Sequence, residues 1–85
     1  MKREQRRLRI CLVDRDRAQG TPSTSCVIAQ AARRQFKTTK VFVGYSFCEI
    51  DGVVYNLDAA GQTIAAMSPG YWHTVKPQTL VLTVR

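Results

Sequence analysis

The stretch KVFVGYSFCEIDGVVYNL, residues 40–57, decides the fold that we predict for this chain. Valine and aromatic residues, which favour β-strands, fill both halves of it, and Asp51-Gly52 lies between them. An Asp-Gly pair supplies the positive φ angles of a tight two-residue turn. We therefore predict a β-hairpin in which Cys48 lies opposite Tyr55.

Both faces of this hairpin are rich in apolar residues. Alternation places on one face Phe42, Cys48, Ile50, Val53, Tyr55 and Leu57. It places on the other face Val41, Val43, Tyr45, Phe47 and Val54. Two explanations stay open: Gly44 marks a bulge that switches the faces, or the second face is covered, for example by a dimer partner.

The remaining segments predict two helices and two more strands. Apolar residues recur at helical spacing in residues 26–36, and again after Asp58, which belongs to a residue type that caps helices. Residues 8–14 and 78–85 alternate between apolar and polar side chains, as strands do. The order along the chain is therefore strand, helix, strand, strand, helix, strand.

That order is the β-α-β-β-α-β arrangement of ferredoxin-like folds. We predict an α+β protein whose two helices cover one face of a four-stranded antiparallel sheet, in strand order 4-1-3-2. At 85 residues the chain forms one domain, residues 1–85, with a basic N-terminal arm at residues 1–7.

Composition indicates a soluble protein of the cytoplasm. No apolar run approaches the roughly 18–20 residues that span a membrane, and the apolar segment after the basic N-terminus is too short for a signal peptide. The three cysteines are widely spaced and odd in number, which is typical of free thiols and not of a secreted disulfide scaffold.

The net charge of +7 is unevenly distributed along the chain. Residues 1–40 carry eleven Lys and Arg against three acids, whereas residues 41–85 carry two against three. Such asymmetry favours an anionic partner, although a charge that only keeps the protein soluble gives the same pattern. The predicted topology would bring most of the basic residues of the first half to one pole, together with Arg85.

Candidate contact residues come from that pole and from the aromatic residues. The basic candidates are Arg3, Arg6, Arg7, Arg9, Arg33, Arg34, Lys37 and Lys40. The aromatic candidates are Tyr45 and Phe47 in the hairpin and Trp72 in a connector at residues 71–77. Trp72 is either an interface anchor or a lid on a thin core. Base stacking on Tyr45 and Phe47, as in RNA-recognition motifs, is a further alternative, which the lack of aromatic residues in strand 8–14 disfavours.

Catalytic chemistry finds little support in the sequence. Cys26 and His73 are conceivable as a nucleophilic pair, but no third residue orients them. A zinc site would need Cys11, Cys26, Cys48 and His73, no two of which come from one short knuckle. Asp14 is followed directly by an arginine, and no glycine-rich phosphate loop is present. We therefore expect no enzymatic activity, no metal and no cofactor.

Four segments together resemble a pattern in small uncharacterised proteins of phages and prophages. They are CVIAQAARR at 26–34, VFVGY at 41–45, DGVVYNL at 51–57 and VKPQTLVL at 75–82. Val27 stands where such proteins often have proline, and Gln78 stands where an aromatic residue is expected. The resemblance implies an accessory protein that acts by binding, as anti-CRISPR proteins do.

On this basis we expect an inhibitor that occludes a host protein or ribonucleoprotein, for instance one of a defence system, in the host cytoplasm. A stand-alone RNA- or DNA-binding domain that uses the basic pole is the alternative. Sequestration of a small anionic nucleotide is a third hypothesis. No membrane partner is expected, and a homodimer would explain the two apolar faces of the hairpin.

Overall fold

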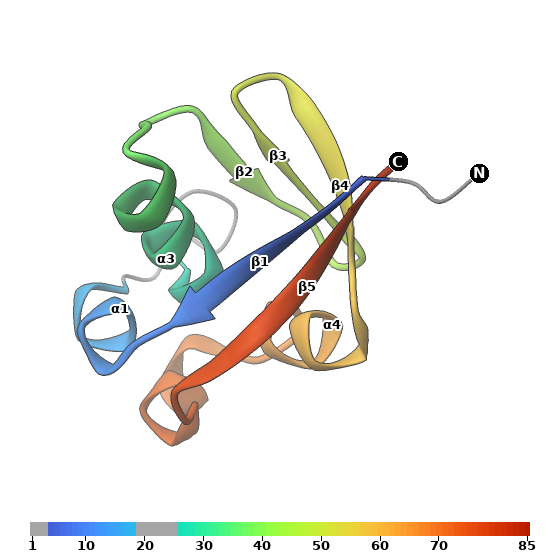
Figure 1. Ribbon diagram of the computed structural model, residues 1–85. Helices are drawn as coiled ribbons and strands as arrows, with labels where there is room; N and C mark the ends of the chain where they lie inside the picture. Colours follow the sequence, from blue (N-terminus) through green and yellow to red (C-terminus); the bar gives the residue numbers. More distant parts are fainter. Residues whose placement is uncertain (1–3, 19–25) are drawn as a thin grey trace.

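The structure is a computed structural model that describes residues 4–18 and 26–85 of the chain. Five strands form one antiparallel sheet in the order β1-β5-β4-β3-β2 (Figure 1). The elements in chain order are β1 (Gln5–Ile10), α1 (Leu12–Arg17), α3 (Val27–Phe36), β2 (Val41–Val43), β3 (Phe47–Ile50), β4 (Val53–Leu57), α4 (Ala59–Ala65), the 3₁₀ helix η1 (Pro69–Thr74) and β5 (Gln78–Val84).

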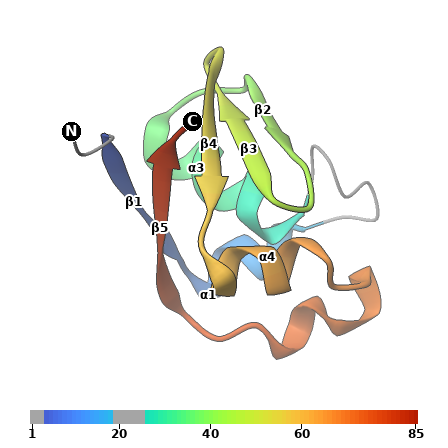
Figure 2. The same ribbon diagram turned by 90° about the vertical axis from the view of Figure 1, so that its right-hand side faces the viewer.

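The sheet curls around α3, which packs against both edge strands, β1 and β2 (Figure 1). In Figure 2 the strands β2, β3 and β4 stand in front of α3, and α4 lies at the bottom of the sheet. The face of the sheet that contacts α3 is the inner face, and the opposite face is the outer face. The curl therefore encloses one side of every strand and leaves the other side open.

Alternating strand residues and one side of α3 build the core. Leu8 of β1 and Leu80 of β5 lie opposite each other and are fully buried. Ile28 and Ala32 of α3 and Ile64 of α4 belong to the same hydrophobic cluster. The helices predicted at residues 26–36 and after Asp58 are confirmed as α3 and α4, and the last predicted strand is confirmed as β5.

The predicted ferredoxin-like fold is wrong, because the sheet has five strands and β1 lies at its edge. The first cause is a turn at residues 44–46, which divides the expected first strand of the hairpin into β2 and β3. These strands pair antiparallel, with Val43 opposite Cys48. Gly44 suits this turn because the ring of Phe47 lies over it. A Cβ atom on residue 44 would meet Phe47 Cε1 at 2.4 Å.

The same reversal changes which side chains enter the core. Val41 and Val43 are buried on the inner face, whereas Phe42 is 43% exposed on the outer face. The prediction that Phe42 shares a face with Cys48 and Tyr55 is therefore wrong, and a turn accounts for the switch of faces where a bulge was considered. After the turn the predicted hairpin register is confirmed, with Cys48 opposite Tyr55.

The second cause is the return of β5 alongside β4. Although α4 and η1 separate these strands in sequence, they are antiparallel neighbours, with Leu57 opposite Leu82. Asp58 fixes this arrangement. One carboxylate oxygen accepts the Gly61 N–H at the start of α4, and the other accepts the Val81 N–H of β5, both at 2.8 Å. Because β5 pairs with β1 on its other side, β1 remains at the edge.

The strand predicted at residues 8–14 is wrong in its second half. Strand β1 ends at Ile10, and α1 follows almost at once. Asp14 explains the change, because its carboxylate accepts the Cys11 N–H at 2.7 Å. The first N–H groups of a helix have no partner within the helix, so this bond favours a helix start at this position.

Helix α3 also protects the free edge of β1. The side chain of Gln35 accepts the Arg9 N–H at 2.8 Å and donates to the Arg7 carbonyl at 2.7 Å. Arg34 Nη2 donates to the Arg9 carbonyl at 2.8 Å. Unpaired groups at a strand edge invite association with other chains, and these bonds occupy three of them.

Candidate partner-binding surface

Arg34, one of the predicted contact residues, is held within the fold. Its guanidinium pairs at two points with the carboxylate of Asp14, Nε to Oδ1 at 2.9 Å and Nη2 to Oδ2 at 3.0 Å. Asp14 is only 1% exposed. The hydrogen bond to Asp14 raises the pKa of the Arg34 guanidinium. Because a buried carboxylate needs its partner, Arg34 has a structural role and does not belong to the candidate surface.

Three other cations from the same region lie together, and we call them the cation cluster: Arg33, Lys37 and Lys40. They line one groove with Thr38, Thr39 and Asp51. The end of α3 and the start of β2 therefore meet. Asp51 is the acid in this groove, and its carboxylate accepts a hydrogen bond from the Thr38 hydroxyl. Within the described residues, no ion pair engages the cation cluster.

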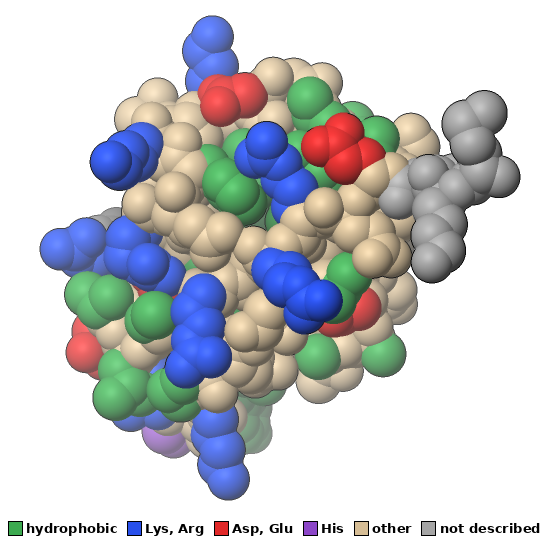
Figure 3. All heavy atoms as spheres, viewed as in Figure 1, with side chains coloured by type: hydrophobic (Ala, Val, Ile, Leu, Met, Phe, Trp, Pro, Cys, Tyr) green, Lys and Arg blue, Asp and Glu red, His purple; other side chains and the backbone are tan. Residues whose placement is uncertain are grey.

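Arg6 reaches the same end of α3, with its guanidinium carbon 5.2 Å from the ring centre of Phe36. Figure 3 shows Lys and Arg side chains spread over the face of the molecule that contains β1 and α3. Residues 5–7, expected in an N-terminal arm, belong to β1. The candidate Arg3 lies outside the described residues.

A second set of cations lies on or beside the outer face of the sheet. On β1, Arg7 and Arg9 are exposed and alternate with buried residues. The complete set is Arg7, Arg9, Lys40 and Arg85. Two acids accompany this set: Glu49 of β3 lies on the outer face, and Asp51 lines the groove beside it together with Lys40. Lys40 lines both the groove of the cation cluster and a groove beside Glu49, so the two surfaces are continuous.

Phe42 and Phe47 form an aromatic pair on the outer face. Their ring centres are 6.2 Å apart, with 29° between the ring planes. The guanidinium carbon of Arg85 lies 5.1 Å from the ring centre of Phe47, and Arg85 Nε donates to Asn56 Oδ1 at 2.9 Å. A row of two rings and a guanidinium therefore crosses the sheet. Simple alternation missed Phe42 for this surface, although Gly44 was the local signal that the faces change.

The two aromatic candidates of the hairpin differ in their surroundings. Tyr45 is 77% exposed in the turn between β2 and β3, whereas Phe47 is half-buried. A largely apolar groove extends from both residues to the end of α4, where Ala65, Met67 and Pro69 line it. Tyr45 is therefore accessible to a partner, and Phe47 only partly.

Trp72 lies in η1, where the sequence suggested only a connector. Its side chain is 5% exposed and belongs to the hydrophobic cluster. Arg15 ties η1 to α1, because its Nη1 donates to the carbonyls of His73 at 2.7 Å and Val75 at 3.2 Å. Of the two roles considered for Trp72, the structure favours the lid on the core, and its ring offers little surface to a partner.

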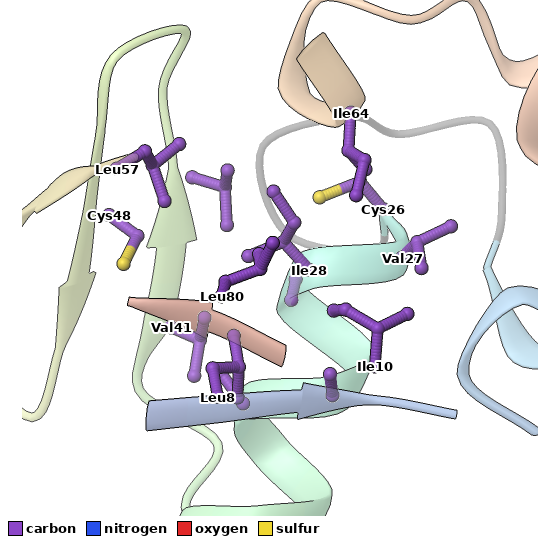
Figure 4. Packing of buried hydrophobic residues seen from close by; sticks show 14 of the residues in the cluster. Leu8, Ile10, Cys26, Val27, Ile28, Val41, Cys48, Leu57, Ile64 and Leu80 are labelled. Atoms are coloured by element: carbon purple, nitrogen blue, oxygen red, sulfur yellow. The ribbon is translucent and has the colours of Figure 1, made fainter. Parts of the chain in front are cut away.

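Cys26 and Cys48 lack the properties of activated nucleophiles. Both are buried, and Figure 4 shows them among aliphatic side chains of the core. Burial raises the pKa of both thiols, that of Cys48 to about 12, although backbone hydrogen bonds at the start of α3 oppose the effect on Cys26. Within residues 4–18 and 26–85, no group of three or more His, Cys, Asp or Glu residues is placed to hold a metal ion.

In the part of the chain that the structure describes, no helix combines the length and the apolar character needed to cross a bilayer. Comparisons of the chain with protein-family models, with curated proteins and with solved structures find no match. The candidate surface therefore rests on the cation cluster and the outer face themselves.

Proposed function

We propose that the protein is a non-catalytic binding module that covers an anionic surface of a host protein or ribonucleoprotein. The observation that carries the proposal is the continuity of the cation cluster with the outer face, where four basic side chains accompany two acids, Glu49 and Asp51. A surface of this charge attracts acidic partners, and salt weakens its binding. Strand β1 holds Arg7 and Arg9, and helix α3 holds Arg33, so these side chains require little backbone ordering on binding.

The resemblance to small phage and prophage proteins supports the biological setting. The proposal places the protein in the cytoplasm of a bacterial host, where it occludes host machinery and needs no catalytic step. Ribonucleoproteins of defence systems suit this charge, because a guide RNA and an acidic protein surface are both anionic.

Capture from a bacterial lysate with the tagged full-length chain tests the proposal. The double variant Arg33→Glu/Lys37→Glu reverses two charges of the cation cluster. Arg17→Glu/Lys76→Glu is the matched control, because both residues are exposed and lie outside that cluster. We expect the wild type and the control to retain a partner at about 50 mM salt and to release it at several-fold higher salt. The cluster variant should bind that partner about tenfold more weakly or worse.

Capture of the same partner by the cluster variant, with unchanged salt dependence, would contradict the proposal. Circular dichroism and thermal unfolding of each variant show that the fold is intact before capture is compared. A stand-alone nucleic-acid-binding domain is the second candidate function, and the aromatic pair Phe42 and Phe47 favours it. Nuclease treatment of the lysate separates this candidate from binding to a protein surface, because only a protein partner survives it.

A further inference from the structure

We infer that the outer face binds single-stranded nucleic acid, with bases stacked on Phe42 and Phe47 and phosphates held by the cations around them. The inference rests on the proposed function, since it names the chemistry of the anionic partner. It assigns the contact to the open side of the sheet and goes beyond the cation cluster at the end of α3.

The first support is the fixed geometry of the rings. Gly44 leaves space for the ring of Phe47, which would otherwise meet a Cβ atom at 2.4 Å. Phe42 lies on one side of that ring at 6.2 Å, and the Arg85 guanidinium lies 5.1 Å from its centre. Phe42 itself is 43% exposed and lies at the edge strand. An exposed ring held in place by its neighbours offers a stacking surface at a small cost in conformational entropy.

The second support is the distribution of charge along the same face. Arg85 lies beside the rings, Lys40 lies next to Phe42, and Arg7 and Arg9 lie at the opposite edge on β1. With strands about 4.8 Å apart, five strands span roughly 19 Å, which suits an extended strand better than one phosphate group. Glu49 and Asp51 are the opposing charges, and two carboxylates among four cations leave the face positive.

The third support is the kind of nucleic acid that such rings accept. Bases in a duplex are already stacked on each other, so aromatic side chains on an open sheet bind unpaired bases. The apolar groove near Tyr45 would also accept a protein segment. However, the cations beside Phe42 and Phe47 favour phosphates, and a protein occupant is therefore an outcome of the test.

Fluorescence anisotropy with labelled oligonucleotides of about 12 nucleotides provides the test. The probes are oligo-dT, oligo-rU and a duplex of the same length. We expect the full-length protein to bind one or both single strands more tightly than the duplex at about 50 mM salt. Affinity should fall steeply at about 200 mM salt, because bound phosphates release counterions.

Two aromatic variants and one control locate the site. Phe42→Ala removes the exposed ring, and Phe47→Leu keeps an apolar side chain at the half-buried position so that the fold survives. Each should weaken single-strand binding about tenfold. Tyr71→Ala, which removes a 63% exposed ring from η1, should leave binding unchanged. Arg7→Ala should lower the slope of log affinity against log salt by about one.

Three results would overturn the inference: duplex binding as tight as single-strand binding, unchanged affinity in both phenylalanine variants, or no oligonucleotide binding at low salt. If the third result accompanies capture of a nuclease-resistant partner that depends on Arg33 and Lys37, the inference fails and the proposed function stands. If reversal of those two charges changes no interaction while oligonucleotides bind through Phe42 and Phe47, the proposed function fails in its stated form.

Discussion

Arg34 and its neighbour Arg33 illustrate how two identical residue types take opposite roles. Arg34 pairs with the buried Asp14 and also donates to the Arg9 carbonyl, so it joins α3 to α1 and β1. Arg33 lines the groove of the cation cluster. Helical spacing does not separate the two, because Arg33 and Arg34 both lie in the last turn of α3 and neither is buried. The ion pair itself was not predicted, since its partner lies 20 residues away.

Replacement of Arg34 should destabilise the fold. In Arg34→Ala the carboxylate of Asp14 stays buried without its partner, and we expect a loss of about 3 kcal/mol in the free energy of unfolding. Urea unfolding monitored by circular dichroism measures this change. Arg33→Ala is the matched control and should shift stability by no more than about 0.5 kcal/mol. Equal effects of the two variants would show that the Asp14 pair does not support the fold as described.

At the scale of elements, side chains of α3 bind the edge of β1 that pairs with no strand. β1 pairs with β5 on one side only, and Gln35 occupies the other side with two hydrogen bonds. Side chains of a helix thus supply the donor and acceptor that a neighbouring strand would supply. This arrangement explains how a curled sheet with a helix inside it avoids an open edge at β1.

Gln35→Ala should open this edge without unfolding the protein. The Arg9 N–H loses its acceptor, and we expect its hydrogen exchange to accelerate about tenfold, which corresponds to a net hydrogen-bond contribution near 1.4 kcal/mol. Exchange measured by NMR at the Arg9 amide provides the readout. Gln30→Ala, in the same helix, is the control. The assigned role of Gln35 would be excluded by exchange at Arg9 that stays at the wild-type rate.

At the scale of the whole molecule, the curl of the sheet separates two environments that alternate along each strand. Cys48 of β3 points inward and is buried, whereas Phe47 and Glu49 beside it lie on the outer face. Burial, with a smaller contribution from nearby Cys26, raises the pKa of the Cys48 thiol from an ordinary 9.0 to about 12. This shift exists only while α3 and the sheet enclose the thiol, so it reports on the fold as a whole.

Stability should therefore fall at high pH. Between pH values of about 9 and 12, the unfolded chain releases a thiol proton that the folded chain keeps, and this difference favours unfolding as pH rises. The contribution of Cys48 is complete below about pH 9 and should shrink by about 3 kcal/mol by pH 11. Urea unfolding of the wild type and Cys48→Ala under reducing conditions measures it. The difference in the free energy of unfolding between the wild type and Cys48→Ala should narrow over this range. A difference that stays constant with pH would contradict the raised pKa of Cys48.

Local signals in the sequence determined a large share of the elements. Helical periodicity predicted α3 and α4, alternation predicted β5, and the turn at Asp51-Gly52 set the pairing of Cys48 with Tyr55. Each of these features depends on residues close together in the chain. The same is true of the meeting between the end of α3 and the start of β2, which brings Arg33 and Lys40 to one groove.

Only the tertiary structure decided the strand order, the role of Arg34 and the exposure of Phe42. These features depend on contacts between distant residues: Asp58 binds Val81 across 23 positions, and Arg34 binds Asp14 across 20. The edge of a strand can pair with any strand of suitable orientation. A charged side chain can be buried only where the fold brings an opposite charge next to it. Sequence periodicity therefore indicates which face of a helix or strand points inward, but it does not indicate which other element packs against that face.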